Sequence, residues 1–162
     1  MKKAIFIDKD GTLIKDVPYN IDPAFISFEE GVIDGLHFLQ ENDFLLVIIS
    51  NQSGIAHGYF TEREFKKARD TIIDRLKQEQ VYLDGFYYCP HHPEAVHREY
   101  AMMCTCRKPQ PGLLLEAARD LEIDCSASWM IGDILDDVEA GNSARCRTVL
   151  INNGNETKWV LS

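Results

Sequence analysis

The stretch Ala4-Ile5-Phe6-Ile7-Asp8-Lys9-Asp10-Gly11-Thr12-Leu13 decides the fold and indicates where chemistry can occur. Its apolar start predicts a buried strand over residues 4–8. In open α/β sheets, ligands bind at the carboxyl ends of the strands. Asp8 and Asp10 should share one face of an extended segment, with Lys9 pointing away from both. Such a pair can hold a hard cation, although Asp-x-Asp-Gly also occurs in plain turns and in calcium loops.

Two further segments supply groups that can bind phosphate. The apolar run 45–49 ends in Ser50-Asn51-Gln52-Ser53-Gly54, whose hydroxyls and amides can contact phosphate oxygens, although the same residues make an ordinary turn. Lys108, in Arg107-Lys108-Pro109, is a compact cation that can neutralise phosphate charge. Taken alone, that segment is equally well interpreted as a solvated basic pair.

A fourth motif again places carboxylates after a short apolar strand, in Trp129-Met130-Ile131-Gly132-Asp133-Ile134-Leu135-Asp136-Asp137. Asp133 at the end of that strand suits magnesium, which prefers oxygen ligands. Asp136 is interpreted as a residue of the first helical turn, where a carboxylate faces the positive end of the helix dipole.

In this order, the four motifs resemble those of the haloacid dehalogenase (HAD) superfamily of phosphatases, over nearly the whole chain. The resemblance implies a magnesium-dependent phosphate monoester hydrolase with an aspartyl-phosphate intermediate. Asp8 would be the nucleophile and Asp10 the general acid and base. The remaining roles follow by motif: Ser50, Asn51, Arg107 and Lys108 would contact phosphate or substrate, Asp8, the Asp10 carbonyl and Asp133 would hold magnesium, and Asp137 would support Lys108 or the waters of the metal.

Cysteine and histidine residues form a second constellation, in Cys89-Pro90-His91 and Cys104-Thr105-Cys106. Four such ligands in two close pairs are typical of a structural zinc site. The zinc would compensate for a loop, residues 89–106, that carries little core-forming pattern. Two buried cysteines with accidental neighbours, or a disulfide, are the alternatives. His92 and His97 are rival ligands, and His91 is preferred because Cys-x-His places both donors on one side of an extended turn.

The Cys-Pro-His-His-Pro and Cys-x-Cys-Arg-Lys-Pro segments resemble a zinc-bearing HAD subgroup that includes phosphatases of heptose bisphosphates and of histidinol phosphate. The segment from Ser50 to Ala56 and the long zinc loop are more similar to the heptose enzymes. The resemblance therefore implies cleavage of the 7-phosphate of D-glycero-D-manno-heptose 1,7-bisphosphate, in the synthesis of lipopolysaccharide precursors. Histidinol phosphate or another small ester remains the alternative. A non-catalytic zinc-stabilised binding module is disfavoured because all the motif residues are present.

Composition limits the class of protein. The 162 residues, 45% of them apolar, suit one domain over 1–162, and the net charge of −9 argues against a nucleic-acid surface. No apolar run approaches a membrane span, and the start does not resemble a signal peptide. Five cysteines, an odd number, favour a reducing cytoplasm over a disulfide framework. We expect a cytoplasmic protein, a monomer, in which Cys125 and Cys146 are plain thiols.

Strands and helices alternate along the sequence. This alternation predicts a Rossmann-like, doubly wound parallel sheet in a three-layer α/β/α fold, HAD-like, without a cap domain and with the zinc loop. We expect strands over 4–8, 44–49, 84–89, 128–132 and 146–151, and helices over 31–42, 61–79, 111–121 and 134–143. Thr61 should cap its helix, with Glu64 completing a capping box. The resemblance also implies a final helix after Trp159.

Overall fold

The computed structural model describes residues 1–160 of the chain. Its sheet has five strands in the order β3-β2-β1-β4-β5, and every pairing is parallel. The bounds are β1 Ala4–Ile7, β2 Leu45–Asn51, β3 Gly85–Cys89, β4 Trp129–Gly132 and β5 Arg147–Leu150. Each lies within two residues of its expected range, which confirms the parallel doubly wound sheet.

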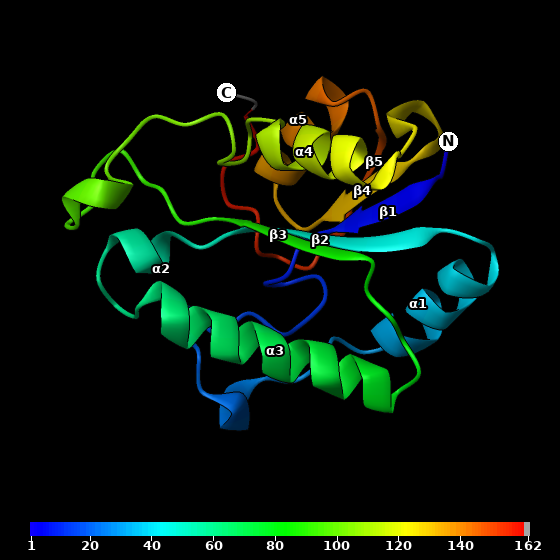
Figure 1. Ribbon diagram of the computed structural model, residues 1–162, viewed down its shortest axis with the longest axis horizontal. Helices are drawn as coiled ribbons and strands as arrows, with labels where there is room; N and C mark the ends of the chain where they lie inside the picture. Colours follow the sequence, from blue (N-terminus) through cyan, green and yellow to red (C-terminus); the bar gives the residue numbers. More distant parts are fainter. Residues whose placement is uncertain (161–162) are drawn as a thin grey trace.

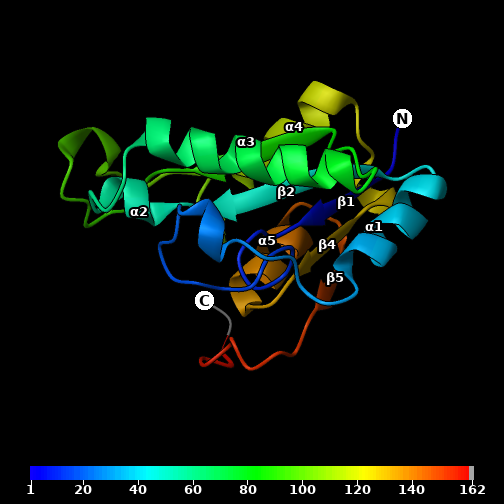
Figure 2. The same cartoon turned by 90° about the horizontal axis from the view of Figure 1, so that it is seen from below.

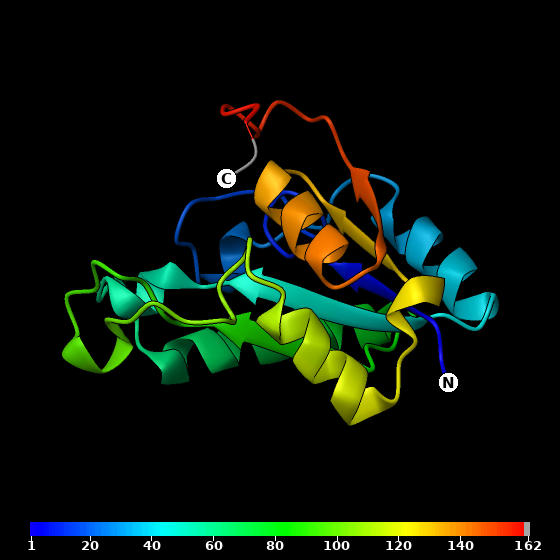
Figure 3. The same cartoon turned by 90° about the horizontal axis from the view of Figure 1, so that it is seen from above.

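Helices cover both faces of the sheet, so the three-layer architecture is also confirmed (Figure 1). The long helices are α1 Val32–Glu41, α3 Glu62–Gln78, α4 Gly112–Leu121 and α5 Leu135–Ser143. Helices α1 and α3 lie in front of the sheet in Figure 2, whereas α4 and α5 lie in front of it in Figure 3. The sequence did not predict the one-turn helix α2, Ser53–Ala56, or three short 3-10 helices at Pro23–Phe25, Arg98–Tyr100 and Cys125–Ala127.

The two faces of the sheet carry separate apolar cores. Ala4 and Phe6 belong to the core under α4 and α5, and Ile5 and Ile7 belong to the core under α1 and α3. The alternation of side chains along β1 sends successive residues to opposite faces. Because helices cover both faces, the central strands β1 and β2 carry continuous apolar runs, Ala4–Ile7 and residues 45–49, as is typical of parallel sheets.

Helix α3 follows its sequence pattern closely. Thr61 is the N-cap, and its hydroxyl accepts a hydrogen bond of 3.1 Å from the Glu64 backbone N–H. The Glu64 carboxylate accepts from that hydroxyl at 3.2 Å and not from the Thr61 backbone N–H, so only half of the expected capping box forms. The apolar side chains at helical spacing are all buried, namely Phe65, Ala68, Ile72 and Leu76. The cap and the buried face fix α3 against the sheet, beside the loops that follow β1 and β2.

All five strands end at the same edge of the sheet, where the connecting loops gather. The zinc loop leaves β3 at this edge and extends beyond the sheet (Figure 1). The helix expected after Trp159 falls on residues 160–162, of which 161 and 162 lie outside the described residues. No helix within residues 1–160 has the length and apolarity needed to cross a membrane.

Candidate active site

A cavity of about 390 Å³ opens at the carboxyl edge of the sheet. Several of the expected site residues line it, namely Asp8, Asp10, Asn51, Lys108 and Asp133. They come from the loops after β1 and β4, from the last residue of β2 and from the segment that precedes α4. Ser50, Arg107 and Asp137 are not among its lining residues. The fold therefore brings most of the four motifs to one place, although they are up to 125 positions apart.

Lys108 lies at the centre of this site. Its ammonium group is 2.7 Å from Asp8 Oδ1 and 2.6 Å from Asp137 Oδ1, and it donates a third hydrogen bond of 2.9 Å to the Ile49 carbonyl. Burial alone would lower the pKa of Lys108, but Asp137 and Asp8 raise it above its ordinary value. Lys108 is therefore a permanent cation beside Asp8.

Asp8 follows β1 directly. Its backbone N–H donates a hydrogen bond of 3.0 Å to the carbonyl of Ile131 in the neighbouring strand β4. Burial raises the pKa of Asp8 well above its ordinary value, while Lys108 acts in the opposite direction. Asp137 raises the pKa further. The positive charge of Lys108 therefore offsets part of the burial that opposes ionisation of Asp8.

Asn51 fixes the segment that carries Lys108. Its side chain donates to the Lys108 carbonyl at 3.1 Å and accepts from the Lys108 N–H at 2.9 Å. This pair of hydrogen bonds joins the end of β2 to the segment before α4. Asn51 thus has a visible structural role, and its expected contact with phosphate stays a prediction.

Gln52 is a site residue that the sequence analysis did not single out. Its amide donates to Ser50 Oγ at 2.7 Å and to Asp10 Oδ2 at 3.1 Å. Ser50 is 0% exposed, and its hydroxyl accepts from Gln52, so its own O–H stays available to donate to a phosphate oxygen. The amide-rich stretch after β2 was the available signal, but a pattern does not show which amide turns inward.

The expectation that Lys9 points away from both aspartates is wrong for Asp10. Lys9 is buried, and its ammonium lies 3.2 Å from Asp10 Oδ1 and 5.5 Å from the Phe65 ring centroid. The alternation ends after Asp8 because the chain turns, with the N–H groups of Leu13 and Ile14 both donating to the Lys9 carbonyl. Asp10 is therefore flanked by two donors, Lys9 and Gln52.

Three carboxylates, those of Asp8, Asp133 and Asp137, lie close enough to hold one metal ion, with ligand atoms within 4.8 Å of one another. Both oxygens of Asp137 are already engaged, because Oδ1 accepts from Lys108 and Oδ2 accepts hydrogen bonds of 3.2 and 3.3 Å from the N–H groups of Asp133 and Ile134. This leaves Asp8 and Asp133 as the carboxylates best suited to a small oxygen-seeking cation. Asp136 lies in the first turn of α5, as expected.

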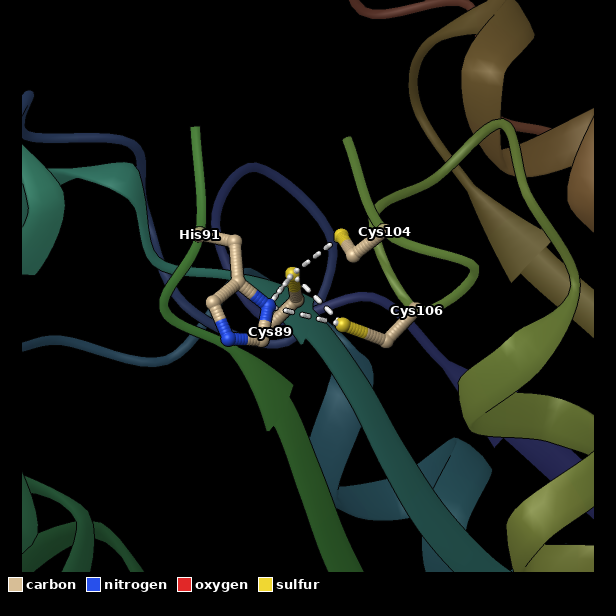
Figure 4. A group of neighbouring side chains, drawn as sticks. All are labelled: Cys89, His91, Cys104 and Cys106. Atoms are coloured by element: carbon tan, nitrogen blue, oxygen red, sulfur yellow. Dashed lines mark hydrogen bonds between the residues drawn. The ribbon is translucent and has the colours of Figure 1, made fainter. Parts of the chain in front are cut away.

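The four expected zinc ligands also come together, although three of them, all but Cys89, lie in a loop (Figure 4). Cys89 Sγ is 3.6 Å from His91 Nδ1, 3.5 Å from Cys104 Sγ and 2.9 Å from Cys106 Sγ. The hydrogen bond with Cys89 is the largest cause that lowers the pKa of Cys106 to about 5. The donor set, three sulfurs and one imidazole nitrogen, fits zinc.

The two rival histidines lie outside this cluster. His92 Nδ1 accepts a hydrogen bond of 3.0 Å from the Glu94 N–H, and its ring packs 4.7 Å from that of His57. His97 lies against Gly58, where a Cβ would be 3.0 Å from its Nε2. The preference for His91 therefore agrees with the geometry.

Comparison with known proteins gives the family. A HAD-hydrolase-like family model matches residues 105–161. The D-glycero-beta-D-manno-heptose-1,7-bisphosphate 7-phosphatase of Photorhabdus laumondii is 45% identical over 152 residues, which are 93% of this chain and 81% of the relative. The protein of that name from Escherichia coli strain K12 is 43% identical over 168 residues, which cover 98% and 88%. The chain belongs to this phosphatase family.

A solved structure of similar fold supports the same family assignment. The D,D-heptose 1,7-bisphosphate phosphatase from B. bronchiseptica, complexed with magnesium and phosphate, is 30% identical, with a TM-score of 0.82. The match covers 94% of this chain and 82% of that one. The protein is therefore a HAD-like phosphatase, a phosphoric monoester hydrolase.

Arg107 has an unusual position in this phosphatase. Its backbone N–H donates to Cys104 Sγ at 3.3 Å, so it is attached to the Cys/His cluster. Its Nη1 is buried without a hydrogen-bond partner among the described residues. A buried guanidinium nitrogen without a partner is costly.

Proposed function

We propose that this phosphatase removes the 7-phosphate of D-glycero-β-D-manno-heptose 1,7-bisphosphate through an aspartyl-phosphate on Asp8. The relatives named for that reaction support the choice of sugar. The observation that carries the chemistry is the buried contact of 2.7 Å between Asp8 and Lys108 at the cavity. It pairs a nucleophile with a fixed cation at the point where a phosphate can enter.

The first step uses Asp8 as the nucleophile. One of its oxygens forms a bond to phosphorus, while the bond between phosphorus and the sugar oxygen breaks. Lys108 offsets the negative charge of the phosphate, and Ser50, whose hydroxyl accepts from the Gln52 amide, donates its O–H to a phosphate oxygen. Asp137 keeps the Lys108 ammonium aimed at Asp8.

Asp10 moves the protons in both steps. It donates a proton to the departing sugar oxygen and later accepts one from the water that attacks the phospho-enzyme, which releases phosphate and restores Asp8. Its two neighbours hold its carboxyl group in place, with Gln52 bonded to Oδ2 and Lys9 to Oδ1.

We assign the metals by donor chemistry. Asp8, Asp133 and the Asp10 carbonyl suit magnesium, which supplies electrostatic stabilisation of the phosphate when bound. Cys89, His91, Cys104 and Cys106 suit a structural zinc that leaves no position open for substrate. The two sites take different ions because carboxylates favour hard cations and thiolates favour soft ones.

Aromatic rings at the mouth of the cavity support a sugar substrate. Tyr19 lines the cavity and is exposed, with its ring centroid 4.7 Å from that of Tyr59. The centroid of the His57 ring lies 5.7 Å from that of Tyr59, and the His92 ring packs against His57. We expect the sugar to lie near these rings, with its second phosphate toward Arg107.

The cellular setting is part of the proposal. We expect one domain over residues 1–162, acting as a cytoplasmic monomer in the synthesis of lipopolysaccharide precursors. The five cysteines of the described chain are all free of disulfides, which agrees with a reducing compartment.

The test compares catalytic efficiency, with magnesium, on heptose 1,7-bisphosphate in both anomers, fructose 1,6-bisphosphate and histidinol phosphate. The proposal expects the β-heptose bisphosphate to be the best substrate and the product to retain its 1-phosphate. A higher efficiency on histidinol phosphate would assign the chain to the other activity of the zinc-bearing subgroup. Release of the 1-phosphate would contradict the proposed regiochemistry.

A further inference from the structure

The segment after β5, residues 153–156, joins two loops of the active site. Asn153 donates a hydrogen bond of 2.8 Å to the Gly11 carbonyl in the loop after β1. Asn155 donates one of 2.6 Å to Asp133 Oδ2 in the loop after β4. Glu156 accepts one of 2.6 Å from the Leu135 N–H at the start of α5. In Figure 3, this red segment runs from β5 back toward that end of α5.

The contact between Asn155 and Asp133 is tight. Asp133 is buried, and a Cβ on Gly11 would lie 2.1 Å from its Oδ2 and 2.6 Å from Asn155 Nδ2. Gly11 is therefore required for the carboxylate and the amide to approach the backbone together. Asp133 Oδ1 has a weaker partner, since its distance to Thr12 Oγ1 is 3.5 Å. One oxygen of Asp133 is thus held firmly and the other is held weakly.

We propose that Asn155 is a positioning residue that orients the Asp133 carboxylate to receive the catalytic divalent cation. The proposal rests on the proposed function, because it takes Asp133 as a metal ligand. A hydrogen bond to one oxygen fixes the rotation of a carboxylate, so that the other oxygen is presented without the entropic cost of ordering it. Partners of this kind behind ligating carboxylates commonly set metal affinity.

Asn155 also lines the cavity, so an effect on substrate must be separated from an effect on the metal. Binding of Mn²⁺ without substrate makes that separation, with the free ion measured by electron paramagnetic resonance. The variant is Asn155→Leu, which keeps the branched shape of the side chain and removes the donor. Asn155 is exposed, so the variant should fold. Asn155→Ala repeats the measurement with a smaller side chain.

Asn153→Leu is the matched control, because Asn153 belongs to the same segment but bonds to backbone groups alone, the Gly11 carbonyl and the Asn155 N–H. We expect Asn155→Leu to raise the dissociation constant for Mn²⁺ by about tenfold or more, and Asn153→Leu to raise it much less. In phosphate release, Asn155→Leu should need more Mg²⁺ for half-maximal rate, and saturating Mg²⁺ should restore most of kcat. A purely structural role would lower the melting temperature without this change.

Wild-type affinity for Mn²⁺ in folded Asn155→Leu and Asn155→Ala would overturn the inference while leaving the proposed function intact. An equal loss in Asn153→Leu would also overturn it, because the effect would then come from the segment as a whole. Failure of the wild-type protein to bind Mn²⁺ would be a different result, since it would remove the metal site of the proposed function itself.

Discussion

The carboxylate site and the Cys/His site differ in what holds their side chains together. In the first, Asp8 and Asp133 follow the ends of hydrogen-bonded strands, and Asn51 ties Lys108 to a third. In the second, only Cys89 lies in a strand, and the other residues belong to the zinc loop. The sheet therefore orders one site through the protein core, whereas the other depends on contacts among its own ligands.

The zinc loop shows why this difference matters. Several of its apolar side chains face solvent, with Val96 76% and Met103 87% exposed. The loop buries little apolar surface to offset the entropy of ordering it. A metal bound by four of its side chains would supply that free energy. Substitutions at the sheet edge should thus lower catalytic activity first. Substitutions in the zinc loop should instead first make that loop less ordered.

The largest expected effect is that of Asp8→Asn. The amide is a poor nucleophile but keeps the shape of the carboxylate, so phosphate release should fall by orders of magnitude while the fold is retained. Steady-state assays measure phosphate release, and circular dichroism measures retention of the fold. Asp74→Asn, on the exposed face of α3, is the control. Near-normal turnover in folded Asp8→Asn would contradict the assignment of the nucleophile.

Asp10→Asn should reduce turnover by about 10²–10⁴-fold, because the departing oxygen loses its proton donor. The loss should be smallest for esters whose leaving groups are already acidic. A series of aryl and alkyl phosphates measures this dependence. An equal loss across leaving groups of very different pKa would exclude the acid role of Asp10.

Lys108→Met should lower the free energy of unfolding as well as the rate of phosphate release. It leaves Asp8 and Asp137 buried without their shared cation. Removing one partner of a buried ion pair costs about 3–5 kcal/mol, measured as the loss in free energy of unfolding in urea. Lys15→Met, at an exposed position, should cost little. Unchanged stability in Lys108→Met would mean that the cation matters to substrate alone.

Arg107→Ala should affect only substrates with two anionic ends. Loss of one charge-assisted contact is worth about 1.5–3 kcal/mol, or roughly 10- to 150-fold in kcat/KM. The heptose bisphosphate should lose that factor, and a monophosphate should lose little. Arg98→Ala, in the same loop, is the control. A similar loss on both kinds of ester would place Arg107 outside the second phosphate site.

The smallest expected effect on catalysis is that of Cys104→Ser. It should release zinc and increase hydrogen exchange across residues 89–106, while the strands stay protected. KM should rise more than kcat falls, because the carboxylates are held by the sheet. Metal analysis measures the bound zinc, and mass spectrometry measures the hydrogen exchange. Cys125→Ser is the control, and it should keep its zinc. Freshly purified wild-type protein without zinc would refute this site.

The sequence by itself determined the sheet, the helices and the grouping of the two ligand sets. Apolar periodicity is a local property, so it located each strand and each of the four long helices to within about two residues. The expected residues after β1, β2 and β4 met because the carboxyl ends of parallel strands share one edge. The pairing of Cys89 and His91 with Cys104 and Cys106 followed from spacing and donor chemistry.

Only the tertiary structure decided which polar groups touch within the site. It bonded Gln52 to Ser50 and Asp10, turned Lys9 toward Asp10, and brought Asn155 onto Asp133 across 22 positions. Arg107 proved to lie off the cavity lining. These contacts depend on how loops from different strands turn and pack together. Hydrogen bonds are short and directional, so no local pattern of residue types specifies which donor reaches which acceptor.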